Sequence, residues 1–293
     1  MFTGCRMQNS PSNWVSGQAS DLDDAQYQFL CGIVYEESRI HLGRDKKALV
    51  ASRLAKRLRE LHLGNYQEYC RHLQSPSGQA ERRHLVDRIS TNHTQFFREM
   101  KHFDFLRDRV LPAWQTVPAG SREALHVWSA ACSSGEEPYS LAIFLAEHLG
   151  PAASGRWQIE ASDISTRVLE KAEAAIYPAD RLTTVRADWL QRHFQKGVGE
   201  WQGHYRVKDS LRERVRFHHL NLLEPNYPFQ QPFHLILCRN VMIYFDRATQ
   251  ESLIRFLSSR LLPDGHLMVG HSESLSGIAH SLRLVQPAIY VKS

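Results

Sequence analysis

The segment that decides the fold runs from Val127 to Ala142 and reads VWSAACSSGEEPYSLA. Its apolar start suits a buried strand, and the small residues at 132–135 suit a tight loop. The Glu-Glu-Pro sequence at 136–138 suits the first turn of a helix, where acids complement the dipole and proline loses no needed donor. A second acid, Asp163, follows another short apolar strand. Such a unit can hold a nucleoside, because small residues admit the ligand to the backbone and the acid accepts hydrogen bonds from ribose hydroxyls.

The composition is that of a globular protein with a sizeable core. The chain has 293 residues, of which 42% are hydrophobic, so it has room for one large domain or two modest ones. Its net charge of +5 permits an acidic partner but does not indicate nucleic acid, and we expect none. No apolar run approaches the roughly 18 residues of a membrane helix, so no direct membrane insertion is expected. Residues 1–20 are polar, lack a secretory signal and are predicted to form a flexible tail.

The cysteines and histidines indicate neither a metal site nor a disulfide framework. The five cysteines lie far apart in the sequence, are odd in number and form no C-x-x-C pair, which favours a cytoplasmic protein. The histidines form no H-x-x-x-H pattern with an acid, so His93 and the pair at 218–219 are interpreted as structural or surface groups. We therefore predict no metal.

Residues 21–90 are predicted to form a helical N-terminal domain. Asp21 can cap a first helix, and apolar side chains recur at helical spacing through 44–62 and 65–73. Basic side chains far outnumber acids in the segment 44–62. This basic helix is either the solvated face of a small bundle or a docking surface for an acidic helical partner. In the second interpretation the docking side chains are Arg53, Lys56, Arg57 and Arg59.

From Leu125 onward, strand and helix patterns alternate. Strands are expected near 125–131, 157–161, 215–219, 233–238, 266–270 and 288–292, and helices near 136–149, 165–175 and 247–261. This alternation predicts an α/β fold with a mostly parallel sheet covered on both faces. Ligands bind beyond the carboxyl ends of such strands. Gly135, Asp163, Asn221 and the pair Arg239–Asn240 follow strand ends, which predicts one shared cleft.

Residues 177–214 interrupt the alternation and are predicted to form a small hairpin insertion. Glycines at 197, 199 and 203 precede a short Tyr-Arg-Val-Lys run. The insertion is either a decorative loop or an exposed sheet edge that pairs with a peptide strand.

Several motifs occur in a characteristic order. They read STNHTQFFRE at 90–99, WSAACSSGEEPYS at 128–140, ASDI at 161–164 and CRNVMIYF at 238–245, with LPDG at 262–265 and GHSE at 270–273. In this order and spacing, the chain from about residue 22 to its C-terminus closely resembles the CheR family, the bacterial chemotaxis-receptor glutamate methyltransferases. Any one motif alone would be a weak signal.

The resemblance implies the class I S-adenosylmethionine-dependent methyltransferase fold, with a helical N-terminal domain (21–90) and a methyltransferase domain (91–293) that carries a small antiparallel β-insertion (177–214). It implies S-adenosylmethionine as methyl donor, S-adenosylhomocysteine as product, and glutamate side chains of chemotaxis receptors as acceptors. The partners would be the acidic cytoplasmic helices of those receptors. In one branch of the family the β-insertion also binds a receptor C-terminal peptide by strand addition.

The same resemblance implies a set of site residues. The cofactor pocket would use Asn92, Thr94, Arg98, Glu137, Asp163, Asn221, Leu222, Arg239 and Asn240, with Gly135 in the loop after the first strand. Tyr244 would lie near the transferred methyl group, so Arg98 and Tyr244 are the catalytic candidates. One departure from the wider superfamily is that Gly135 is the only glycine of that loop.

The chemistry requires little acid–base machinery. A glutamate side chain has an ordinary pKa of about 4.3 and is already a nucleophile at neutral pH, so catalysis must come mainly from positioning and partial exclusion of water. Arg98, expected in the first turn of a helix starting near Gln95, would orient a carboxylate of the cofactor or the substrate. Alternatively, Arg98 forms a surface ion pair with Glu99 or with a neighbouring acid.

Other site residues also have bland interpretations. Asp163 can cap the helix that follows it, and Glu137 can serve only the helix dipole instead of a cofactor ammonium. Asn221 can read an adenine edge, and Tyr244 can be ordinary core. Two competing functions remain open for the chain: a catalytically silent adaptor, and a methyltransferase acting on nucleic acid or a small molecule.

Overall fold

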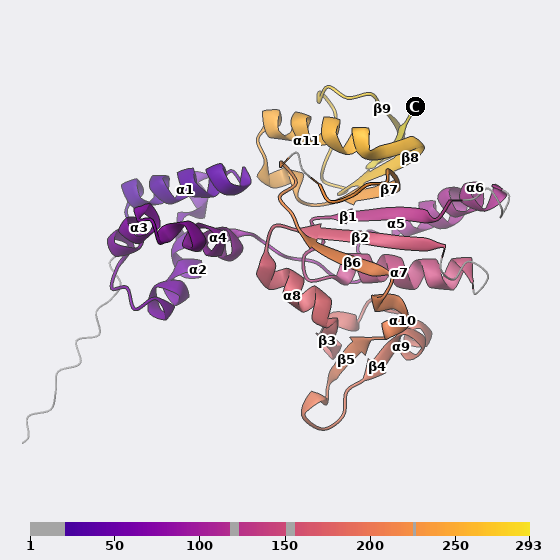
Figure 1. Cartoon of the computed structure of the whole chain (residues 1–293), viewed down its shortest axis with the longest axis horizontal. Helices are drawn as coiled ribbons and strands as arrows, with labels where there is room; N and C mark the ends of the chain where they lie inside the picture. Colours follow the sequence, from indigo (N-terminus) through magenta and orange to yellow (C-terminus); the bar gives the residue numbers. More distant parts are fainter. Residues whose placement is uncertain (1–20, 118–122, 151–155, 225–226) are drawn as a thin grey trace, which may run out of the picture.

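The computed structural model describes residues 21–117, 123–150, 156–224 and 227–293. A helical domain lies beside a larger domain built on a sheet, and a small three-stranded sheet projects from the larger domain (Figure 1). The flexible tail predicted at 1–20 lies outside the described residues. Within the ranges described, no helix has the length and hydropathy that a membrane span requires.

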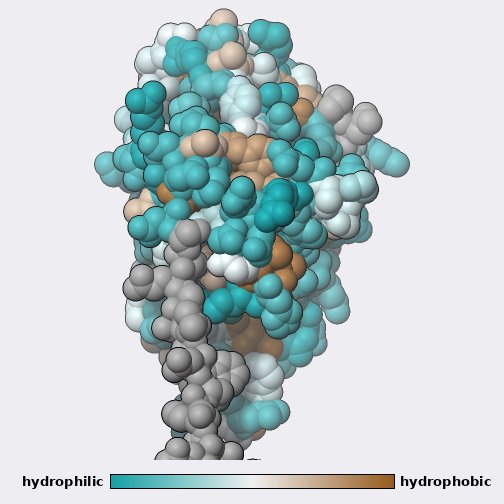
Figure 2. Space-filling model, turned by 90° about the vertical axis from the view of Figure 1, so that its left-hand side faces the viewer, coloured by the Kyte–Doolittle hydropathy of each residue, from teal (hydrophilic) through white to brown (hydrophobic). Residues whose placement is uncertain are grey.

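The helical domain is a small bundle with its own core. Its helices are α1 (Asp24–Ser38), α2 (Lys47–Glu60), α3 (Tyr66–Gln74) and α4 (Gly78–Ile89), with the short 3-10 helix η1 (Arg44–Lys46) before α2. Leu30, Leu54 and Leu85 pack with Tyr69 in its centre and are fully buried. Figure 2 shows the outer face of this part of the molecule, where hydrophilic side chains surround small apolar patches.

The first helix begins two residues later than the sequence indicated. The N-cap of α1 is Asp23, not Asp21, because the Asp23 carboxylate accepts the Gln26 amide at 2.7 Å while the Gln26 side chain accepts the Asp23 amide at 3.1 Å. This reciprocal pair is a capping box.

The larger domain contains a seven-stranded sheet of order β6-β2-β1-β7-β8-β10-β9. Its strands are β1 (Leu125–Ala130), β2 (Trp157–Asp163), β6 (Val215–His219), β7 (Phe233–Cys238), β8 (Leu261–Val269), β9 (Leu282–Gln286) and β10 (Ile289–Lys292). The pairs β6–β2, β2–β1, β1–β7 and β7–β8 are parallel, and β10 and β9 are antiparallel additions beside β8. The predicted mostly parallel sheet is confirmed. The sequence missed β9 because the edge strand buries only Leu282, so its pattern does not alternate.

Side chains of the sheet alternate between two cores. Val127 and Leu235 face the layer that contains α7 (Glu136–Leu149) and α8 (Thr166–Ala174). Trp128 and Ile236 face the layer that contains α11 (Arg247–Arg260). Both faces of the sheet are therefore covered, as predicted (Figure 1). Residues of α5 (Met100–Phe105), the π-helix η2 (Leu106–Val110) and α6 (Leu111–Thr116) join the first core.

The predicted antiparallel insertion is confirmed. Its strands β3 (Ile176–Pro178), β4 (Phe194–Lys196) and β5 (His204–Val207) pair in the order β3-β5-β4. The 3-10 helices η4 (Ala179–Leu182) and η5 (Gly199–Trp201) and the short helices α9 (Ala187–His193) and α10 (Asp209–Arg212) complete it.

Candidate functional site

One cavity lies where the carboxyl ends of β1, β2 and β7 meet the helical domain. It holds about 1290 Å³ of space outside protein atoms, part of it open to solvent. Strand ends, the linker after α4 and the segment between α1 and α2 all contribute to its wall. The predicted site residues in this wall are Asn92, Thr94, Arg98, Glu137, Asp163, Asn221, Leu222, Arg239, Asn240 and Tyr244.

Gly135 is the one predicted cofactor residue that is not in the cavity wall. It precedes α7 with φ of 93°, a left-handed conformation that favours glycine. A Cβ there would lie 2.8 Å from the Tyr177 hydroxyl and 2.9 Å from the Ala172 Cβ. Gly135 therefore shapes the start of α7 and its contact with α8, and its contact with the cofactor stays a prediction. Ala131 and Ser133, which the sequence did not single out, line the cavity instead.

Asp163 ends β2 with its carboxylate buried beside the cavity. The two oxygens accept the amides of Ser133 at 2.8 Å and Ser165 at 2.9 Å. Burial raises the pKa of Asp163, and the two amides oppose that effect. The N-cap position of α8 belongs to Ser165, so Asp163 is not the cap residue. A carboxylate has about four acceptor sites, which leaves capacity for ligand hydroxyls.

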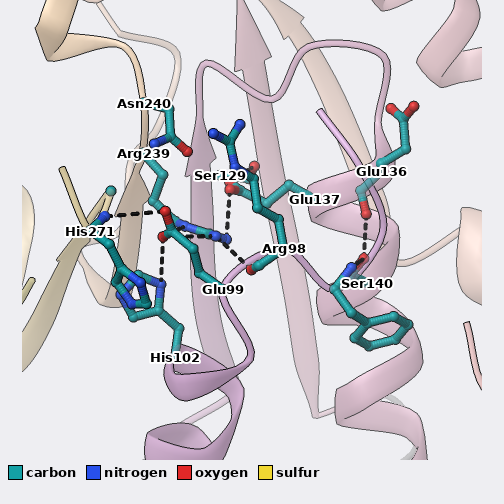
Figure 3. A network of polar contacts seen from close by, with 12 residues as sticks. Arg98, Glu99, His102, Ser129, Glu136, Glu137, Ser140, Arg239, Asn240 and His271 are labelled. Atoms are coloured by element: carbon teal, nitrogen blue, oxygen red, sulfur yellow. Dashed lines mark hydrogen bonds and ion pairs between the residues drawn. The ribbon is translucent and has the colours of Figure 1, made fainter. Parts of the chain in front are cut away.

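An ion-pair network is centred on Arg239 (Figure 3), and Arg239 and Glu137 connect it to the cavity wall. The guanidinium is 2% exposed and donates to Glu137 Oε2 and Glu99 Oε2, both at 3.1 Å, and to the Arg98 carbonyl at 2.6 Å. Glu137 also accepts the Ser129 hydroxyl at 2.7 Å. Burial raises the pKa of Glu137, while Arg239 favours its charged form. Arg239 thus holds two acids that approach from different elements.

Sequence reasoning missed the central place of Glu99. The sequence suggests it only as an ion-pair partner for Arg98, but it pairs with Arg239 and accepts the His271 amide at 3.1 Å. Burial alone would raise the pKa of Glu99, but Arg239 and that amide outweigh it and lower the pKa. Its place beside Arg98 in the 90–99 motif is the only signal that the sequence carries.

His102 lies next to this network and is almost fully buried. Burial, together with the charge of Arg239, lowers its pKa to about 3, so the ring is neutral near pH 7. Ligand atoms of Glu99, His102 and His271 lie within 4.8 Å of one another. The guanidinium of Arg239 already bonds the Glu99 carboxylate, and its positive charge disfavours a metal cation there.

Arg98 precedes a helix and does not lie within its first turn. Helix α5 begins at Met100 because Phe97 and Glu99 adopt left-handed φ angles of 53° and 60°. Phe97 is buried, whereas Met100 is 48% exposed. The Arg98 guanidinium donates to the His93 carbonyl at 3.1 Å and lines the cavity. The alternative of an Arg98–Glu99 surface pair is wrong, because Glu99 is engaged by Arg239.

Two asparagines in the wall differ in how they are satisfied. The Nδ2 atom of Asn92 is buried with no hydrogen-bond partner among the described residues. Such an orphaned donor is costly unless a ligand accepts from it. Asn221 instead donates to the Glu37 carbonyl at 3.0 Å and accepts the Leu223 amide at 3.1 Å. Its amide, expected to read an adenine edge, is used to tie the loop after β6 to α1.

Tyr244 stands at the end of the 3-10 helix η6 (Met242–Tyr244), in the cavity wall. Met242 on one side is buried, whereas Ile243 is 54% exposed and Tyr244 is half-buried. The Tyr244 carbonyl accepts the His41 amide at 2.8 Å, which joins this turn to the helical domain. Tyr244 is therefore a cavity residue and not ordinary core.

The basic helix α2 divides into inward and outward side chains. Arg57 bonds Glu81 at 2.6 and 2.9 Å, and Glu81 is only 4% exposed. Arg53 donates to the Ile89 and Ser90 carbonyls and to the Thr91 hydroxyl. These two arginines hold the bundle and the linker together and are only partly exposed, and their contact with a partner stays a prediction. Lys56 and Arg59 are exposed.

A second hollow lies on the β-insertion. It is lined by parts of β3, β4 and β5 and by the loop between β4 and β5. Val198 is 80% exposed there and Trp201 is 49% exposed. Two large exposed apolar side chains at the rim of a hollow are typical of a surface that binds another protein or a ligand.

Comparisons with known proteins now identify the family. Residues 25–90 match the CheR methyltransferase all-alpha domain, and residues 92–291 match the CheR methyltransferase SAM binding domain. The chain belongs to the CheR methyltransferase family. Its S-adenosylmethionine-binding domain is therefore confirmed. The cavity contains groups that could hold this ligand: the orphaned Asn92 amide, the buried Asp163 carboxylate and the Arg98 guanidinium.

Curated relatives in this family cover nearly the whole chain. The chain is 42% identical over 272 residues to the chemotaxis protein methyltransferase of Salmonella typhimurium, which covers 93% of this chain and 91% of that protein. It is 41% identical over 273 residues to the Escherichia coli protein of the same name, with 93% and 92% covered. It is 39% identical over 282 residues to chemotaxis protein methyltransferase 2 of Pseudomonas aeruginosa, with 96% and 98% covered.

Proposed function

We propose that this protein transfers a methyl group from S-adenosylmethionine to glutamate side chains of chemotaxis receptors and forms methyl esters. The convergence of ten of the predicted site residues on one cavity is the observation that supports this best. The substrate follows from the family and from the names of the curated relatives. We expect the protein to act in the cytoplasm, where the receptor helices that it would methylate lie.

The cavity offers a partner for each end of the ligand. Asp163 would accept the ribose hydroxyls, Leu222 would form an apolar wall, and the orphaned Asn92 amide would donate to the ligand. Glu137 would face the ammonium group of the methionine part, so opposite charges meet there. Bound S-adenosylmethionine supplies a methyl group on a positively charged sulfur.

The residues of this chain would act by orienting the acceptor. A glutamate side chain, whose ordinary pKa is about 4.3, arrives ionised, so no general base is needed. Arg98 would orient the acceptor, and the Tyr244 hydroxyl would stand near the reacting atoms. Opposite charges cancel as the methyl group moves, so partial exclusion of water by the α1–α2 segment favours the reaction.

Receptor docking would use two surfaces outside the cavity. The exposed Lys56 and Arg59 on α2 would face the acidic receptor helices. The hollow on the β-insertion, with Val198 and Trp201 at its rim, would accept a receptor C-terminal peptide added beside β4.

Titration calorimetry with S-adenosylhomocysteine, followed by incubation with radiolabelled S-adenosylmethionine and receptor-containing membranes, tests the proposal. We expect saturable binding and base-labile label on the receptor. Binding without transfer would favour the adaptor alternative. No binding at all would remove the proposed site.

A further inference from the structure

The motif GHSE at 270–273 carries a buried carboxylate that the proposed mechanism does not use. Glu273 is 6% exposed and lies beyond the end of β8. Its Oε2 atom accepts the amides of Asn240 and Gly270, both at 2.7 Å. Its Oε1 atom accepts the amides of Met242 at 2.8 Å and Ile243 at 3.3 Å. A single side chain thus satisfies backbone donors along the whole turn that follows β7.

This turn is the one that carries two proposed site residues. Asn240 has a left-handed φ of 58°, and Tyr244 follows Ile243 directly. A run of amides that converges in this way forms an anion-binding concavity, and here the chain fills it with its own carboxylate. An unsatisfied buried amide is costly, so without the Glu273 carboxylate we expect the turn to rearrange until its amides find other acceptors.

The same segment also reaches the other side of the cavity. The His271 amide donates to Glu99, which holds Arg239, and Arg239 bonds the Arg98 carbonyl. The segment 270–273 therefore fastens both the Arg98 side and the Tyr244 side of the cavity to the end of β8.

We propose that Glu273 is a positioning residue for methyl transfer, whose carboxylate holds the 240–244 turn in the shape that brings Asn240 and Tyr244 into the cavity. The inference rests on the proposed function for the role of Tyr244. It does not require Glu273 to touch the cofactor or the receptor.

Glu273→Gln is the sharpest test, because it keeps the size of the side chain and replaces one acceptor oxygen by an NH₂ group that faces backbone N–H donors. The matched control is Glu213→Gln, the same change at an exposed carboxylate. We expect Glu273→Gln to lower kcat by about 10- to 100-fold, since a displacement of about 1 Å can cost 10²-fold. The rate is divided by the fraction of enzyme that binds S-adenosylhomocysteine in calorimetry, so a loss of folded protein does not count. An unchanged kcat per binding-competent enzyme would overturn the inference.

Gly270→Ala tests the same turn if Glu273→Gln does not fold. A Cβ at Gly270 would lie 2.4 Å from Asn240 Nδ2 and 2.8 Å from Glu273 Oε2, so it must displace one of them. Reduced kcat per binding-competent enzyme supports the inference, and wild-type kcat contradicts it. Failure of the proposed function has a different signature, because the wild-type protein itself would then fail to bind or to methylate.

Discussion

The arginines of the helical domain and those of the cavity differ in their bonding partners, and these partners decide which guanidinium groups remain available to a ligand. In the helical domain, Arg57 pairs with buried Glu81, and Arg53 donates to the linker after α4. In the cavity, Arg239 pairs with two acids much as Arg57 does, whereas Arg98 keeps its guanidinium at the wall with one bond to a carbonyl. Arg239, which pairs with acids, therefore stabilises the site, whereas Arg98, which does not, can bind a substrate.

The largest expected effect distinguishes the two cavity arginines. Arg239→Ala leaves the carboxylates of Glu99 and Glu137 without their cation, and removal of one partner from a buried ion pair costs about 3–5 kcal/mol. Denaturant unfolding measures this loss. Arg98→Ala is the matched variant, and we expect it to unfold within about 0.5 kcal/mol of wild type while methyl-ester formation falls at least ~100-fold. Equal destabilisation by the two variants would contradict the division of roles.

The helical domain gives a parallel contrast of smaller size. Arg57→Ala removes the cation that pairs with Glu81, which is 4% exposed and keeps a hydrogen bond from the Tyr69 hydroxyl. This change should lower the unfolding free energy by about 2 kcal/mol, because a buried carboxylate then lacks a charged donor. Lys56→Ala on the same helix should change it by less than about 0.5 kcal/mol, because Lys56 is exposed. Similar unfolding midpoints for both variants would show that Arg57 is not an internal tie.

The uneven success of sequence reasoning has the same physical origin. The positions of Asp163 and Asn240 at the cavity could be predicted because both lie at the carboxyl ends of strands, and those ends meet at one edge of the sheet. The direction of Arg53 and Arg57 was missed because charge counting along a helix does not show which acids another helix brings. Glu81 is 24 residues from Arg57 and on a different helix.

Ion pairs between residues far apart in the sequence could not be predicted either. Glu99 and Arg239 are 140 residues apart, and their pairing depends on how α5 and β7 meet at the cavity. The start of α5 was misplaced because left-handed φ angles at Phe97 and Glu99 override the helical pattern. Tertiary packing therefore decided the details that the motifs could not.

The pH dependence of stability probes the buried neighbour of the cavity arginines. The pKa of His102 is about 3 in the folded protein and about 6.5 when unfolded, so the unfolded state binds the extra proton between these values. The stability of the folded protein with its neutral His102 ring is therefore fully present well above pH 6.5. It is lost as the pH falls, by about 1.4 kcal/mol at pH 5.5. Between pH 7.5 and 5.5, the unfolding free energy of wild type should fall by about 1.4 kcal/mol more than that of His102→Gln. Parallel curves would contradict a buried neutral ring.

The smallest expected effect concerns the outward side of α2. Lys56→Glu and Arg59→Glu, tested singly, should each slow receptor methylation about two- to fivefold at low salt, because exposed charges steer association weakly and are screened. The affinity for S-adenosylhomocysteine should stay unchanged, since neither residue lines the cavity. Arg255→Glu, at an exposed position of α11, is the matched charge reversal. If Arg255→Glu slows methylation as much as the α2 variants do, the effect belongs to net charge and α2 is not a docking surface. If only the α2 variants respond, and the response disappears at high salt, then α2 keeps Arg53 and Arg57 for the fold and offers Lys56 and Arg59 to the receptor.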